Sequence, residues 1–198
     1  MYQIFKIMLF LLLPFALSAQ NNASLFDAYM KAQFNLYGFN GNVLISKKGI
    51  VIYKQSFGFS NYETRTTLDD NSVFDCGSIA KEFTVVGILL LKDKGRLSYS
   101  DKLKKFFPQL SHYNVTIQQL LTHTSGLPDG FDLVEKYFNH NKIAVNDDLI
   151  HLMETKKPEL LFKPGGSLMY SGTAFNLLAS IIENLSGESY KSNRFLNR

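Results

Sequence analysis

The sequence lacks a second cysteine: Cys76 is the only one, so no disulfide can form within the chain. The fold must therefore be held by core burial and hydrogen bonds. Motifs that bind metals are also missing, because the four histidines show no ligand spacing and no second cysteine could complete a zinc site. We therefore predict no metal and no cofactor.

Long hydrophobic runs are scarce. The run near the N-terminus, residues 7–17, is too short to span a bilayer. A lysine precedes it and the small residues Ser18 and Ala19 follow, which is the pattern of a secretory signal peptide over residues 1–19. Cleavage fits after Ser18 as well as after Ala19, and no cysteine lies there to carry a lipid anchor. We expect a soluble mature chain, residues 20–198, that is secreted or periplasmic and has no membrane span.

A strong excess of either charge is missing as well. Loss of the signal peptide would remove Lys6 and lower the formal net charge from +4 to +3. The basic residues are interleaved with acidic ones, as between Lys92 and Lys105. This pattern is typical of a solvated surface rather than of a phosphate-binding groove, so we expect no nucleic-acid partner.

The apolar residues recur with periods that predict both helices and strands. The expected elements are a helix over residues 22–37, hairpin strands over 41–46 and 50–57, a long helix from about Ser78 to Gly95, and helices over 115–124, 147–155 and 173–185. The segment 60–71 and the chain after Pro128 are expected to form turns and loops. The long helix is apolar nearly all round, which predicts burial at the centre of a domain.

These elements predict an α+β fold in which helices pack on an antiparallel sheet. Only two strands are convincing, whereas an independently stable sheet needs more strands or extensive cover by helices. Residues 20–198 are therefore expected to be the N-terminal portion of a domain whose C-terminal strands are missing.

The strongest local motif is Ser78-Ile79-Ala80-Lys81, at the start of the long helix. Residues three apart lie on one helix face, so Lys81 can reach the Ser78 hydroxyl and accept its proton, which would turn the serine into a nucleophile. The helix N-terminus adds partial positive charge where an acyl oxyanion would form. The motif is short, and an N-cap serine followed by an exposed lysine would give the same four letters.

A second motif, Tyr170-Ser171-Gly172, follows a glycine-rich turn and precedes the last helix. A tyrosine beside a Ser-Lys pair could share the proton and pass it to a leaving group. The alternative is a packing tyrosine whose hydroxyl finds a local partner.

From about Asn42 to Tyr190 the chain resembles the superfamily of class C β-lactamases, D,D-peptidases and serine esterases, in motif content and in motif order. The matching stretches are GNVLI (41–45), FDCGSIAKEFT (74–84), GRLSYSDKL (95–103), IQQLLTHTSGLP (117–128) and PGGSLMYSGTAFNLL (164–178). The resemblance implies a β-lactamase/transpeptidase-like fold.

The same resemblance implies the roles of individual residues. Ser78 would be the acylated nucleophile and its amide half of the oxyanion hole, Lys81 the proton acceptor, and Tyr170 the general acid-base partner. His123, within the HTSGL stretch, is interpreted as structural and stays outside the catalytic set.

The chain departs from the family pattern at two points. Gly172 stands where an asparagine commonly binds the substrate's acylamido group, which makes a β-lactam or peptide less favoured than a simpler ester. The third family motif, Lys or His followed by Thr or Ser and then Gly, has no match after Gly172. That strand would supply the other oxyanion donor, so a chain that truly ended at Arg198 would be expected to be inactive.

Two functions remain open at this stage. The first is a secreted serine hydrolase that acts through an acyl-enzyme on a small-molecule or peptide acyl substrate. The alternative is a non-catalytic remnant or a module that binds cell-wall peptides without turning them over. A purely structural secreted protein would leave Ser78, Lys81 and Tyr170 as coincidences.

Overall fold

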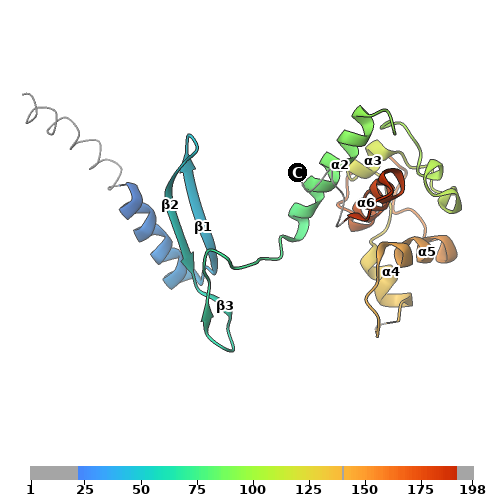
Figure 1. Ribbon diagram of the computed structural model, residues 1–198. Helices are drawn as coiled ribbons and strands as arrows, with labels where there is room; N and C mark the ends of the chain where they lie inside the picture. Colours follow the sequence, from blue (N-terminus) through green and yellow to red (C-terminus); the bar gives the residue numbers. More distant parts are fainter. Residues whose placement is uncertain (1–21, 140, 191–198) are drawn as a thin grey trace, which may run out of the picture. The chain divides into compact units, whose positions relative to one another are not determined.

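The computed structural model describes residues 22–139 and 141–190 of the chain. The predicted signal peptide, residues 1–19, lies outside the described residues. The chain divides into two compact units, Met1–Asp75 and Cys76–Arg198, and each is described by itself (Figure 1).

The first unit is a helix packed on a hairpin. The helix covers residues 22–37 in the described part of the chain. The strands are β1 (Gly41–Lys47), β2 (Ile50–Phe57), β3 (Phe59–Asn61) and β4 (Thr66–Thr67). Aromatic rings join the helix to β2, with ring centroids 6.0 Å apart for Phe26 and Tyr53 and 6.2 Å apart for Phe34 and Phe57. Figure 1 shows this helix running alongside the β1–β2 pair.

The β1–β2 hairpin confirms the hairpin predicted from the sequence. The conformation of its turn explains why the two strands pair. Strands β1 and β2 are antiparallel and joined by Lys48 and Gly49 alone, with φ of 52° and 79°. Two positive φ values are typical of the tight turn whose twist matches that of paired strands. The short β3–β4 hairpin begins at Phe59 and overlaps the segment 60–71, which was expected to hold only turns, so that prediction was incomplete.

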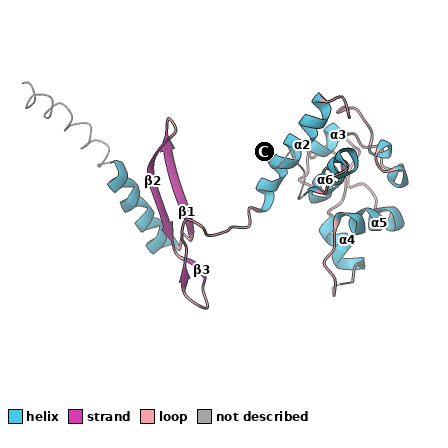
Figure 2. Ribbon diagram, in the orientation of Figure 1, coloured by secondary structure: helices cyan, strands magenta, loops and turns pink. Residues whose placement is uncertain are grey.

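The second unit is helical in its described part (Figure 2). Its α-helices are α2 (Ala80–Asp93), α3 (Ile117–Leu121), α4 (Gly130–Tyr137), α5 (Asn146–Lys156) and α6 (Gly172–Ser186). Three single turns of 3-10 helix accompany them: η1 (Gly77–Ile79), η2 (Leu103–Lys105) and η3 (Pro108–Leu110). One core of aliphatic side chains holds these elements together, and α6 contributes most to it.

Helices α2 and α6 form the packed pair that carries the candidate site. Helix α2 buries Ile88 and Leu91 in the core, while α6 buries Leu177, Leu178 and Ile181 completely. Beyond α6, the Tyr190 hydroxyl lies 2.7 Å from the Thr84 hydroxyl of α2. Burial of this many aliphatic side chains, at roughly 1.5–3 kcal/mol each, fixes the position of α2 relative to α6.

Within the described part of the second unit, the long helix α2 is buried on one side. Phe83, Val86 and Leu89 recur every three residues along α2 and are 53%, 45% and 41% exposed. The described part of this unit packs on one side of α2 only.

A further correction concerns the chain after Pro128, which was expected to be a loop. It forms helix α4, because the Asp129 carboxylate accepts a hydrogen bond from the Phe131 amide at 2.9 Å and caps the helix N-terminus. Leu133 of α4 is buried in the core. The letters Pro-Asp-Gly, typical of a turn, hide this cap in the sequence.

Gly126 offers a test of the loop before α4. It has φ of +75°, and a Cβ there would collide with the Phe162 carbonyl oxygen. We expect Gly126→Ala to lower the free energy of unfolding by more than about 2 kcal/mol, from backbone strain and overlap together. Gly187→Ala, with φ of +73° and nothing within 4 Å of its Cβ, should cost only the strain of about 1–2 kcal/mol. Urea unfolding measures both, and equal losses would contradict the close approach to Phe162.

Candidate active site

Ser78 lies in a turn that leads directly into α2. The 3-10 turn η1 contains Gly77, Ser78 and Ile79, and the α-helix begins at Ala80. Gly77 has φ of +50°, a conformation that favours glycine. The sequence placed Ser78 at the helix start, and the structure places it one short turn earlier, with its side chain exposed.

The three predicted catalytic side chains meet at the Ser78 hydroxyl. Tyr170 Oη lies 2.5 Å from Ser78 Oγ, although the two residues are 92 positions apart in the chain. Lys81 Nζ donates a hydrogen bond to the same Oγ at 3.2 Å. Lys81 reaches it along one face of the helix start, as predicted. All three side chains belong to the second unit.

Lys81 also acts on Tyr170 electrostatically. Its ammonium nitrogen lies 5.0 Å from the centroid of the Tyr170 ring. Hydrogen bonding from Lys81, and then the bond with Ser78, lowers the pKa of the Tyr170 phenol below its ordinary value. Desolvation, and after it the charge of Asp129, act in the opposite direction. With its pKa lowered, the Tyr170 phenol loses its proton more readily than an ordinary tyrosine does.

Tyr170 is held in place by His123. The His123 carbonyl accepts a hydrogen bond from the Met169 amide at 2.9 Å, and its ring atom Nδ1 accepts one from the Ser171 amide at 3.1 Å. The centroid of its imidazole ring lies 4.7 Å from that of the Tyr170 ring and 5.0 Å from that of the Phe175 ring. His123 thus fixes the residues before and after Tyr170 and stacks on Tyr170 itself.

The acceptor role requires His123 to be neutral, since a protonated imidazole has no free lone pair at Nδ1. Burial, and then the charge of Lys81, lowers the pKa of His123. The backbone of His123 has φ of +56°, which is uncommon for a residue other than glycine. The sequence analysis placed His123 outside the catalytic set. These contacts make it a positioning residue.

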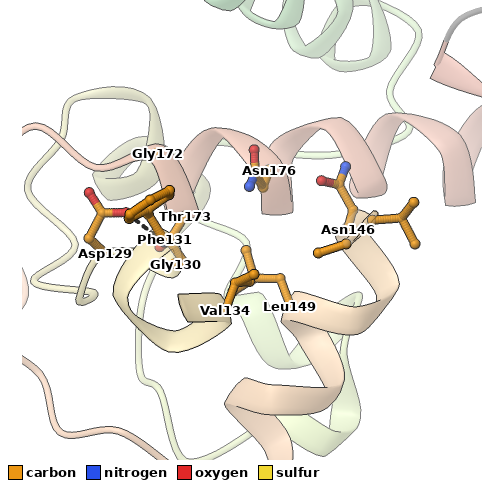
Figure 3. A pocket seen from close by; sticks show the side chains of 11 residues that line it. Asp129, Gly130, Phe131, Val134, Asn146, Leu149, Gly172, Thr173 and Asn176 are labelled. Carbon is orange, nitrogen blue, oxygen red and sulfur yellow. Dashed lines mark hydrogen bonds between the residues drawn. The ribbon is translucent and has the colours of Figure 1, made fainter. Parts of the chain in front are cut away.

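A hollow of about 290 Å³ opens beside Gly172, between α4, α5 and α6 (Figure 3). Asp129 and Phe131 border it at the start of α4, Asn146 at the start of α5, and Asn176 on α6. A Cβ placed on Gly172 would lie 4.0 Å from Asp129 Oδ1. Gly172, predicted as a substrate-binding position, therefore lies at the edge of this hollow.

The described residues contain no group of three or more His, Cys, Asp or Glu side chains that could hold a metal ion. Among the described helices, none is both long and apolar enough to cross a membrane.

Comparison with known proteins identifies the family. The family model described as Beta-lactamase matches residues 23–193. The chain belongs to the beta-lactamase family. The match confirms the predicted resemblance and covers most of the chain, including Ser78, Lys81 and Tyr170.

Individual members of the family support the assignment. The chain is 41% identical over 152 residues to penicillin-binding protein 4* of Bacillus subtilis, which covers 77% of this chain and 34% of that protein. It is 32% identical over 155 residues to the protein flp of Staphylococcus aureus, covering 75% of this chain and 30% of that protein. The chain thus spans about a third of the length of these relatives.

Solved structures give the same fold. The penicillin-binding protein from Bacillus halodurans superposes with a TM-score of 0.71 at 28% identity, covering 84% of this chain and 51% of that one. This likeness confirms the predicted α+β class of the β-lactamase/transpeptidase type.

The His123 contacts predict a measurable effect on stability. In His123→Ala the buried Ser171 loses the acceptor of its amide, which should cost about 1–3 kcal/mol in the free energy of unfolding. His123→Asn keeps an acceptor oxygen on a residue that tolerates positive φ, so this variant should lose less free energy of unfolding than His123→Ala does. Denaturant unfolding of both variants checks this order, and the reverse order would contradict the acceptor role.

The same residue predicts a pH dependence. Because folding lowers the pKa of His123, its contribution to stability is complete above the unfolded-state value of about 6.5 and declines as the pH falls toward the lower folded value. Below about pH 6.5 the difference in the free energy of unfolding between the wild type and His123→Asn should therefore become smaller. An unchanged difference between the two proteins from pH 8 to pH 5 would show that His123 titrates normally.

Proposed function

We propose that the protein is an exported serine hydrolase that cleaves acyl substrates through an acyl-enzyme on Ser78. The observation that carries the proposal is the pair of contacts at Ser78 Oγ, 2.5 Å to Tyr170 Oη and 3.2 Å to Lys81 Nζ. A nucleophile, a base and a cation that stabilises the base are together at one exposed point. Export rests on the signal-peptide pattern of residues 1–19.

The contacts favour Tyr170 over Lys81 as the group that receives the serine proton. The sequence analysis gave this role to Lys81. Tyr170 Oη lies closer to Ser78 Oγ than Lys81 Nζ does, and the nearby Lys81 lowers the pKa of the phenol. In this arrangement Lys81 donates to Ser78 Oγ and stabilises negative charge on the phenol oxygen.

The reaction then proceeds in two balanced halves. Ser78 Oγ attacks the substrate carbonyl carbon while its proton passes to Tyr170 Oη, which gives a tetrahedral oxyanion. The bond to the leaving group breaks, and the proton on Tyr170 passes to that group, leaving an ester on Ser78. Water reverses these steps: Tyr170 takes its proton, and the Ser78 oxygen leaves with a proton returned from Tyr170.

The substrate class follows from the edge of the hollow. Gly172 has no side chain with which to bind an acylamido group, whereas the proton transfer at Ser78 needs no atom of residue 172. We therefore propose esters as substrates in preference to β-lactams and D,D-peptides. The alternative, a non-catalytic remnant or a module that binds cell-wall peptides without turnover, differs in leaving Ser78 unmodified.

Labelling by a fluorophosphonate tests the nucleophile. The probe should add its phosphonyl group to Ser78 with loss of fluoride, because the serine oxygen is activated by its neighbours. Intact-protein mass spectrometry should show one adduct on the wild type and on Ser111→Ala, which removes an exposed serine elsewhere. No adduct should form on Ser78→Ala. A folded wild type that stays unlabelled would support the non-catalytic alternative.

The role of Lys81 makes a separate prediction. Lys81→Met removes the cation that favours the Tyr170 phenolate, so the labelling rate near pH 7 should fall by about a hundredfold or more. The rate should recover in part as the pH approaches the ordinary tyrosine value of about 10, since the phenolate then forms unaided. If the variant showed no such recovery while circular dichroism showed it folded, Lys81 itself would be the proton acceptor.

A further inference from the structure

We infer that Phe175 is a positioning residue for Lys81, because the face of its ring attracts the lysine ammonium and holds it beside the Ser78 hydroxyl. The inference rests on the proposed function, since it names a residue that would act on the Ser78 nucleophile through Lys81. Phe175 lies outside the Ser-Ile-Ala-Lys and Tyr-Ser-Gly motifs, so the sequence alone gives it no role.

Two aromatic rings lie near the amino group of Lys81. Its Nζ atom is 5.0 Å from the centroid of the Tyr170 ring and 5.7 Å from that of the Phe175 ring. Both distances fall within the range of about 6 Å over which a ring face attracts a cation. None of the ion pairs within the described residues involves Lys81. The two rings therefore take the place that a carboxylate would fill in an ion pair.

The two rings differ in burial and in chemistry. Tyr170 is 56% exposed and its hydroxyl contacts Ser78, whereas Phe175 is 6% exposed and carries no polar group. The attraction between a cation and a ring is stronger where water is excluded, which favours the buried ring. Phe175 can neither donate nor accept a proton. It can therefore hold the lysine without competing for the proton that leaves Ser78.

The position of the Phe175 ring is fixed by the core and by His123. Phe175 lies in the first turn of α6, and its side chain belongs to the aliphatic and aromatic core of the second unit. The planes of the Phe175 and His123 rings are tilted by 32°, with their centroids 5.0 Å apart. A ring with so little freedom can restrict the long, flexible side chain of Lys81, which must reach Ser78 Oγ at 3.2 Å.

The alternative is that Phe175 only fills space in the core. In that case the volume of the ring matters, and the electron density of its face does not. Fluorine atoms on the ring separate the two roles, because they withdraw electron density from the face and change the volume little. A cation over the face then loses attraction with each fluorine, whereas the packing is nearly unchanged.

The test is the rate at which a neutral fluorophosphonate labels Ser78 in the full chain. Phe175 is replaced in turn by phenylalanine that carries one, two or three ring fluorines. The rate should fall at each step, by about threefold to thirtyfold over the series, which is the loss expected when a cation–π contact is removed. Phe175→Leu, which has no ring, should be labelled no faster than the trifluorinated protein.

Two controls assign the effect to Lys81. The same fluorinated series at Phe107, which is 4% exposed and over whose ring no lysine or arginine nitrogen lies within the described residues, should leave the rate unchanged. In His123→Asn the steps at Phe175 should persist, because they arise at Lys81 and not through the ring contact with the imidazole. Circular dichroism checks that each protein is folded.

The outcomes separate the inference from the proposed function. A labelled wild type whose rate stays the same throughout the Phe175 series overturns the inference and leaves the hydrolase standing. Steps that disappear in His123→Asn, or equal steps at Phe107, also overturn it. A folded wild type that stays unlabelled at Ser78 overturns the proposed function, and the inference with it.

Discussion

The packing of α2 against α6 is the constraint on which the candidate site depends. Ser78 and Lys81 stand at the start of α2, and Tyr170 stands just before α6, so the three meet only when the two helices are held in register. Completely buried side chains such as Ile88 and Leu177 supply that register. A contact of 2.5 Å between residues 92 positions apart is therefore a product of the core and not of the local chain.

A second, smaller constraint sets the orientation of the Tyr170 side chain. Helix packing places the start of α6, but the orientation of the Tyr170 ring is set by His123, through two hydrogen bonds to its neighbours and a ring contact. This arrangement needs a neutral imidazole, and burial together with Lys81 keeps it neutral. Lys81 thus lowers the pKa of the Tyr170 phenol and adds to the effect of burial in lowering the pKa of His123.

The sequence predicted what depends on local pattern. It predicted a last helix over residues 173–185, close to the observed α6, and it placed Lys81 one turn from Ser78. It missed what depends on long-range contact. Helix α4 was hidden because Asp129 reads as part of a turn, and the approach of Asp129 to Gly172 follows from tertiary packing that no spacing reveals. The role of His123 depends on a positive φ and a partner 48 residues away.

The acylation rate of Tyr170→Phe measures what the contact between Ser78 and Tyr170 contributes. The change removes the hydroxyl that contacts Ser78 and leaves the ring that stacks on His123, so the fold should be retained. Because the account makes this hydroxyl the proton acceptor, the rate of fluorophosphonate labelling at Ser78 should fall by about a hundredfold or more. A folded Tyr170→Phe protein that is labelled as fast as the wild type would contradict the claim that the contact between Ser78 and Tyr170 is the centre of the chemistry.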